Sequence, residues 1–148
     1  MNPQILEQLN DKTAIRELID LYANYADTKQ TEKQAALFTD DYTVALYYDS
    51  TSETPTQTVT GKDNLKQLFI DNLSPFPKTM HLNGQSIITL DDETASGIVY
   101  CRAYHQSIAD GKEQFMIAAI RYEDEYRKAN GKWYFQSRKL LVQWIENR

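Results

Sequence analysis

Two short segments, "ADGK" at 109–112 and "ANGK" at 129–132, constrain the fold of this chain most. Asp-Gly and Asn-Gly pairs favour the tight turns that join antiparallel strands. The stretches around these turns are rich in β-branched and aromatic residues, as strands are, and "DDE" provides an earlier connection. We expect strands at about 80–90, 95–108, 113–126 and 132–145. The second half of the chain therefore predicts a long antiparallel meander.

Helical periodicity replaces this pattern in the first half of the chain. Between Asp11, which suits a helix N-cap, and Asp27, apolar residues recur at helical spacing and predict an amphipathic helix. "TEKQAALF" begins with the capping-box pair Thr31 and Gln34 and predicts a short second helix that ends at Phe38. "KDNLKQLFIDNL" predicts a third helix, which "SPFP" stops.

Further strands are expected between these helices, and the order of elements indicates the fold class. "DDYTVALYYD", residues 40–49, has strand composition, and a short strand precedes Gly61. Helices followed by a long meander are typical of an α+β fold. We expect the N-terminal helices to pack in the concave face of a strongly curved mixed or antiparallel sheet. Such a cone-shaped α+β barrel would leave a ligand cavity at its open end.

Composition and charge narrow the classes of partner. The chain has 148 residues, which suits a single domain over 1–148. A formal net charge of -5 and the lack of a long apolar run argue against nucleic-acid and membrane binding. The sequence shows no signal-peptide pattern, and its sole cysteine, Cys101, excludes an internal disulfide. We expect a cytoplasmic protein in which Cys101 is a buried apolar residue.

The strand "GIVYCRAYHQ", residues 97–106, divides its side chains between two faces. Val99, Cys101 and Ala103 share one face with His105, and small residues leave space above a strand. We therefore expect these four to line a cavity, the alternative being a core histidine with one hydrogen-bond partner. The side chains expected to cover the outer face are Ile98, Tyr100, Arg102 and Tyr104.

Asp27 and the only two histidines of the chain, His81 and His105, are the candidates for acid-base chemistry. Asp27 follows the apolar stripe of the first helix. The alternative to a catalytic role is an exposed aspartate, which is common at such a position. His81 shares a strand face with Asn83 and Gln85. Because buried polar groups need partners, this polar face indicates either a pocket wall or a surface-facing strand.

The ordered set "YADTKQ", "MHLNG" and "GIVYCRAYHQ" resembles the scytalone dehydratase-like, SnoaL-like branch of the nuclear transport factor 2-like superfamily. The helical start "AIRELIDLYANYAD", "LFTDDYTV", "GKDNL" and the end "YRKANGKWYFQSRKL" also resemble common elements of that family. The resemblance covers most of the chain. It implies the cone-shaped fold and, in catalytic members, activity without a cofactor.

The resemblance also implies a catalytic group. In dehydratases of this type an aspartate and two histidines act together, and Asp27, His81 and His105 stand in their places. In the related bile-acid dehydratases and lindane dehydrochlorinase, a polar residue five positions before the aspartate and an arginine on the last strand recur. Those positions are Tyr22 and Arg138 here. The alternative to a catalytic role is that Tyr22 is a core residue and that Arg138 is an outward-facing charge.

The resemblance is incomplete at the pocket. Ala26 stands where scytalone dehydratase has a tyrosine, and Ile120 and Tyr122 stand where its third meander strand carries small polar groups. The departures imply a substrate other than scytalone. The residues expected to bind the substrate are Val99, Cys101, Ala103, Ile120 and Tyr122.

Taken together, these residues favour a cofactor-independent lyase or isomerase, with dehydratase-like acid-base elimination, acting on a small, largely apolar, cyclic or polyketide-like molecule. Asp27 would fix the tautomer of His81 and make its other ring nitrogen a stronger base, and His105 would act as acid or second base. Tyr22 or Arg138 would hold an oxygen on which negative charge develops.

Other functions remain open at this point. A small-molecule-binding or structural module would keep the cone without the chemistry, and small subunits of ring-hydroxylating dioxygenases share the fold. Asp27, His81 and His105 could also form a facial metal site. We expect no metal and no cofactor, because the resemblance is to cofactor-free relatives and the sequence has no compact ligand motif.

The expected outer face of the meander suggests self-association. Tyr100 and Tyr104 lie there, with Phe115 and Ile117 on the next strand, and this face is too aromatic to be stable in water. We expect a homodimer or homotrimer packed sheet to sheet.

Overall fold

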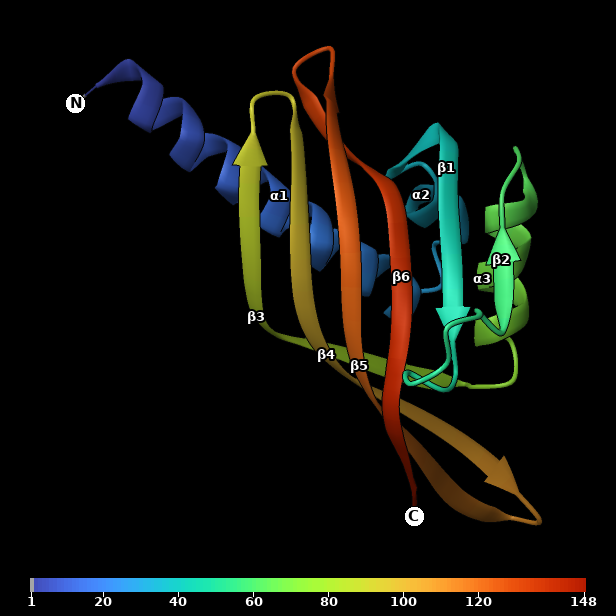
Figure 1. Cartoon of the computed structure of the whole chain (residues 1–148). Helices are drawn as coiled ribbons and strands as arrows, with labels where there is room; N and C mark the ends of the chain where they lie inside the picture. The colour runs from blue at the N-terminus through green and yellow to red at the C-terminus, as the bar shows by residue number, and fades with distance from the viewer. Residues whose placement is uncertain (1) are drawn as a thin grey trace.

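The computed structural model describes residues 2–148 and places three helices against a six-stranded sheet (Figure 1). In chain order the elements are α1 (Pro3–Asp27), α2 (Thr31–Ala35), β1 (Phe38–Tyr47), β2 (Gln57–Val59), α3 (Asn64–Leu73), β3 (Lys78–Asp91), β4 (Thr94–Ala109), β5 (Lys112–Ala129) and β6 (Lys132–Asn147). The predicted meander is thus confirmed, with each strand longer than expected. No helix among these residues is long and apolar enough to cross a membrane.

The strands lie in the order β2-β1-β6-β5-β4-β3, and the sheet is mixed because β1 runs parallel to β6 while every other pair is antiparallel. Figure 1 shows the long strands of the meander bending around the side on which α1 lies. Register shifts within β1–β6, β3–β4 and β5–β6 accompany this bending, since bulges increase twist. The expected α+β fold is confirmed, and the sheet is curled without closing into a barrel.

The first helix begins at Pro3, well before the start expected at Asp11. Asn2 Oδ1 accepts a hydrogen bond from the backbone N–H of Gln4 at 2.8 Å, and proline fits the first helical turn because its missing N–H would have no partner there. Asp11 is not a cap. Its Oδ1 accepts from Lys128 Nζ and Trp133 Nε1, both at 3.0 Å, and joins α1 to the sheet.

The second helix is shorter than predicted and lacks the predicted capping box. Gln30 occupies the N-cap without a side-chain cap bond, and the side chain of Gln34 is buried. The helix ends at Ala35 because Phe38 already belongs to β1, where it pairs with Phe135 of β6. Their rings stack with centroids 4.8 Å apart. Packing against the sheet therefore overrides helical propensity at this end.

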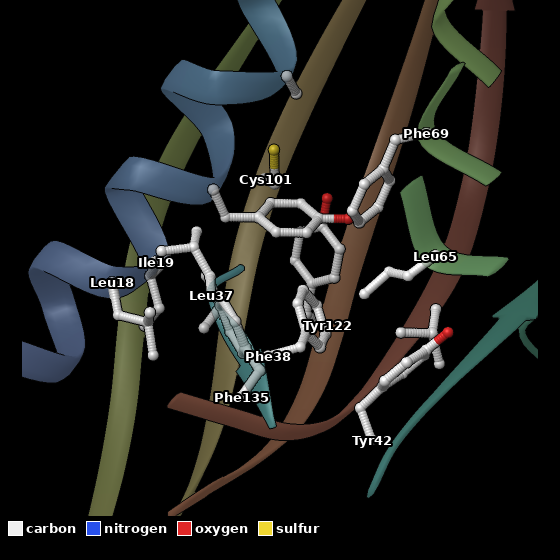
Figure 2. Close-up of a cluster of buried hydrophobic side chains, with 14 of the residues drawn as sticks. Leu18, Ile19, Leu37, Phe38, Tyr42, Leu65, Phe69, Cys101, Tyr122 and Phe135 are labelled. Atoms are coloured by element: carbon white, nitrogen blue, oxygen red, sulfur yellow. The ribbon is translucent and has the colours of Figure 1, made fainter. Parts of the chain in front are cut away.

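The interior lies between α1, α3 and the concave face of the sheet. Figure 2 shows Ile19 of α1, Phe69 of α3 and Tyr122 of β5 within this cluster. The ring of Tyr22 meets four aromatic neighbours edge-on or tilted, with centroids 5.6 to 6.1 Å away. Aromatic pairs in these arrangements add to the free energy gained from burying their area. The predicted apolar stripe of α1 is therefore its buried face.

A bulge in β3 corrects one sequence prediction. The β3–β4 register shifts between Asn83 and Ser86, so Gln85 does not continue the face that carries His81 and Asn83. Gln85 is exposed, whereas Asn83 Nδ2 donates to Asp20 Oδ1 of α1 at 3.0 Å. The strict alternation assumed from the sequence fails where an extra residue is inserted.

Candidate active site

Asp27 and His81 form a close pair where α1 ends against β3. His81 Nδ1 lies 2.7 Å from Asp27 Oδ1. The same carboxylate accepts from the backbone N–H of His81, at 3.0 Å to Oδ2, and from Thr79 Oγ1 at 3.0 Å. Both side chains are largely shielded, with 22% of Asp27 and 10% of His81 exposed. The carboxylate thus accepts hydrogen bonds from a side-chain hydroxyl and from the strand backbone as well as contacting the ring.

This contact assigns the tautomer of His81. An ionised carboxylate only accepts hydrogen bonds, so Nδ1 carries the proton in the neutral ring. Nε2 is then the unprotonated nitrogen, and His81 lines a cavity. A negative partner at Nδ1 stabilises the imidazolium that forms when Nε2 takes a proton. The predicted pairing of Asp27 with His81 matches this geometry.

His105 lies beside His81 on the neighbouring strand. The two ring centroids are 5.9 Å apart, and Phe76 lies 4.8 Å from His105 on another side. His105 Nδ1 donates to the backbone oxygen of Met116 at 3.3 Å. Burial lowers the pKa of His105, and the adjacent His81 lowers it further. At neutral pH His105 is therefore an uncharged ring whose free Nε2 accepts, which favours a second base over an acid.

The cavity that these histidines border has a volume of about 320 Å³. Tyr22, Ile120 and Tyr122 also line it, together with mostly apolar side chains from α3, β1 and β6. Its size falls at the lower end of the range for small-molecule sites. The cavity therefore suits a small, largely apolar ligand.

Three of the expected substrate-binding residues lie elsewhere. Val99, Cys101 and Ala103 are on the concave face, as predicted, but they are packed into the core at 0%, 6% and 0% exposure. Figure 2 shows Cys101 among the core side chains near α1. None of the three is among the residues that line the cavity beside His81, since each belongs to the hydrophobic core cluster. Burial raises the pKa of the Cys101 thiol to about 11 and leaves it protonated.

Arg138 points into the protein, so the alternative of an outward-facing charge is wrong. It is 2% exposed and lines the cavity. Its guanidinium lies 3.5 Å from the ring centroid of Tyr122 and 4.3 Å from that of Tyr22. Arg138 Nε donates to Asp124 Oδ1 at 2.9 Å, and the hydroxyl of Tyr126 donates to Asp124 Oδ2 at 2.7 Å. Within residues 2–148, Nη1 and Nη2 of Arg138 have no hydrogen-bond partner.

The buried acid of this network, Asp124, was not predicted from the sequence. Alternation along β5 places Asp124 and Tyr126 on the same face as Ile120 and Tyr122, and that pattern was available in the sequence. Gly97 of β4 provides the room, because a Cβ there would lie 2.8 Å from the hydroxyl of Tyr126. The arginine is therefore neutralised and held by its neighbour on the adjacent strand.

A SnoaL-like domain model matches residues 7–139 of this sequence, which is most of the chain. The chain belongs to the SnoaL-like family. Among curated proteins, none matches it significantly. Within the described residues, this SnoaL-like chain has no group of three or more His, Cys, Asp or Glu side chains placed to hold a metal ion.

Solved structures share the fold of this SnoaL-like protein. A Novosphingobium aromaticivorans protein with a provisional scytalone dehydratase assignment has a TM-score of 0.82 at 24% identity, over 95% of this chain and 89% of its own. A hexachlorocyclohexane dehydrochlorinase has a TM-score of 0.82 at 19% identity, over 97% of this chain and 92% of its own. The β subunit of a provisionally assigned aromatic-ring-hydroxylating dioxygenase from Novosphingobium aromaticivorans has a TM-score of 0.76 at 19% identity, over 95% of this chain and 94% of its own. At these identities the likeness establishes the fold alone.

Proposed function

We propose that this SnoaL-like protein is a cofactor-independent lyase or isomerase that acts by acid-base elimination. The observation that carries the proposal is the contact of 2.7 Å between Asp27 and His81 beside an apolar cavity. A base oriented by a carboxylate and facing a shielded cavity is the arrangement needed to remove a proton from carbon.

The proposed reaction begins with His81. Its Nε2 takes a proton from a carbon next to a carbonyl, and the electrons of the C–H bond move onto the carbonyl oxygen. Arg138 Nη1 or Nη2, or the hydroxyl of Tyr22, donates to that oxygen as negative charge develops. The returning electrons form a C=C bond and expel a hydroxyl or halide from the next carbon, and the proton on His81 leaves with it as water or hydrogen halide.

The same first step supports isomerisation. If the substrate has no leaving group, the proton held on His81 returns to a different carbon and the double bond has moved. His105, with its free Nε2, would serve as a second base or as an acceptor that orients the substrate. The largely apolar walls suit a cyclic or polyketide-like molecule. Two of the structural neighbours carry names of elimination enzymes, a dehydratase and a dehydrochlorinase.

The second candidate is a module that binds or assembles without catalysis. The likeness to a dioxygenase β subunit favours it, because that fold neighbour is named as a subunit of a larger enzyme. The two functions differ in one measurable property. Only the lyase or isomerase would catalyse exchange of carbon-bound hydrogen with solvent.

The test is deuterium wash-in from heavy water, followed by NMR for a panel of cyclic β-hydroxy and β-halo ketones. The wild type should accelerate exchange or elimination for at least one compound, and His81→Ala should lower the rate roughly 10²-fold to 10⁴-fold. Thr79→Val removes one hydrogen bond to Asp27 but leaves the Asp27–His81 contact, so it serves as the matched control and should retain most of the rate. Wild-type binding of these ketones without any exchange would favour the non-catalytic module.

A further inference from the structure

Gln34 is a buried polar side chain of the cavity that the proposed reaction leaves unused. It comes from α2, is 2% exposed, and lines the same cavity as His81 and Arg138. Across residues 2–148, its Oε1 has no hydrogen-bond partner. An amide oxygen removed from water without a partner costs free energy, and such groups are rare in folded proteins. A hydrogen-bond donor in the cavity would remove this cost.

A purely structural role does not account for the amide. The side chain makes no capping bond, since the N-cap of α2 is Gln30 and no side chain caps that end. The backbone of Gln34 is already satisfied, because its N–H donates to Gln30 O and its carbonyl accepts from Leu37 N–H. Methionine would fill nearly the same volume without burying an unpaired oxygen. Packing alone would therefore favour an apolar residue here.

Besides polar side chains such as His81, His105 and Tyr22, the mostly apolar cavity carries two buried polar groups that complement each other. Arg138 offers its unpaired Nη1 and Nη2 as donors, and Gln34 offers Oε1 as an acceptor. Asp124 balances the charge of Arg138, so the pair does not demand an anionic ligand. Such an arrangement suits an uncharged molecule that carries both an acceptor and a donor.

We propose that Gln34 is a specificity-determining residue whose Oε1 accepts a hydrogen bond from a hydroxyl or N–H group of the ligand. The inference rests on the proposed function only in requiring that a small molecule binds in this cavity. A ligand without the donor leaves the amide oxygen unpaired, and sites built to pair with a polar group discriminate strongly against analogues that lack it.

Two ring compounds of nearly equal shape provide the probe. In 2-naphthol a hydroxyl offers both a donor and an acceptor, whereas in 2-methoxynaphthalene the methyl group removes the donor and leaves the oxygen. Both are uncharged at neutral pH, and their binding is followed by ligand fluorescence. The wild type should bind 2-naphthol about tenfold more tightly than 2-methoxynaphthalene, as expected for one buried hydrogen bond.

Gln34→Met should abolish this preference while the affinity for 2-methoxynaphthalene stays within about twofold, which also shows that the cavity is intact. The matched control is Gln143→Met, the same chemical change at an amide of β6 whose Nε2 donates to Leu141 O. It should keep the tenfold preference. Equal binding of the two probes by the wild type, or a preference that survives in Gln34→Met, overturns the role of Gln34 alone. Failure of the wild type to bind either probe overturns the role of Gln34, whereas the deuterium-exchange assay with ketones tests the proposed function separately.

Discussion

At the scale of single residues, Asp27 has two tasks. It orients His81 through Nδ1, and it also accepts from the His81 backbone N–H and from Thr79 Oγ1, which hold the end of α1 against β3. Asparagine is nearly isosteric with aspartate, but its amide group replaces one acceptor oxygen by a donor. Asp27→Asn therefore disturbs the dyad and a structural contact at once.

The dyad predicts non-additive kinetics. Asp27→Asn should retain the fold and lower the rate of the proposed elimination roughly 10²-fold to 10⁴-fold, as should His81→Ala. Because the two residues act as one base, the double variant should be little slower than either single variant. The measurement is kcat for all three variants on a substrate identified by deuterium exchange. Single-variant effects that multiply in the double variant would contradict the dyad.

Thr79→Val separates the two tasks of Asp27. It removes one hydrogen bond to the carboxylate and should cost about 0.5–1.5 kcal/mol of unfolding free energy, with little change in kcat. A parallel loss of kcat and stability in this variant would show that the position of the carboxylate depends on the hydroxyl.

His105 predicts a dependence of stability on pH. Its pKa in the folded protein is lowered by burial, so between that value and the unfolded pKa of about 6.5 the unfolded chain binds more protons. Its contribution to stability is therefore complete above about pH 6.5 and is lost as the pH falls below that value. His105→Asn cannot titrate, so its urea-unfolding free energy should fall less than that of the wild type on acidification. An equal fall in both proteins would assign the effect to other groups.

At the scale of elements, β5 and β6 are joined by a buried ion pair as well as by backbone hydrogen bonds. Asp124 and Arg138 are direct partners in the strand register, and both are almost fully buried. Burial raises the pKa of Asp124, while the charge of Arg138 and the hydroxyl of Tyr126 oppose that rise. Each partner thus depends on the other to remain charged in the interior.

Removal of one partner should be costly. Asp124→Ala leaves the guanidinium of Arg138 buried without its counter-charge and should lower the unfolding free energy by about 3–5 kcal/mol. The control is Asp41→Ala, which breaks an exposed pair with Arg127 at 3.0 Å and should lower the unfolding free energy far less, because solvent screens that pair. Chemical denaturation measures both. Equal losses of unfolding free energy would mean that burial does not determine how much the Asp124–Arg138 pair contributes to stability.

The elements also show what the sequence could predict. The alternation of side chains along the strands and the turns at 109–112 and 129–132 were sufficient to predict the meander, because hairpin turns and strand faces depend on local chemistry. The bulge after Asn83 and the early end of α2 depend on contacts with distant strands, so no local pattern predicted them. The predicted Asp27–His81 pair is close in the structure, whereas Val99, Cys101 and Ala103 lie in the core cluster. A face assignment from the sequence does not show what packs on top of that face.

At the scale of the whole molecule, the convex face of the sheet exposes large apolar side chains. Leu82, Arg102, Ala119 and Trp144 are successive partners across β3, β4, β5 and β6, and they share that face. Leu82 is 60% exposed and Trp144 is 61% exposed. Of the residues expected on this face, Ile117 is instead buried by its neighbours at 3% exposure. Apart from Arg102, this row is apolar and suits sheet-to-sheet contact.

Self-association through this face remains a prediction. Sedimentation at micromolar concentration should show a homodimer or a homotrimer, and Leu82→Glu should shift the protein toward monomer by burying a charge in the contact. Glu113→Gln, an exposed change on the β4–β5 hairpin, is the control and should leave the oligomer intact. A wild type that sediments only as a monomer would contradict the prediction.

The contacts of Asp27 have a consequence for how members of this family are compared by descent. A chain that lost the reaction would still gain stability from a carboxylate that accepts from Thr79 Oγ1 and from a strand N–H, and selection for folding alone would preserve it. The imidazole of His81 makes no comparable structural hydrogen bond, since its ring is hydrogen-bonded only to Asp27 among residues 2–148. On the proposed function, retention of the histidine should therefore distinguish catalytic from non-catalytic relatives better than retention of the aspartate.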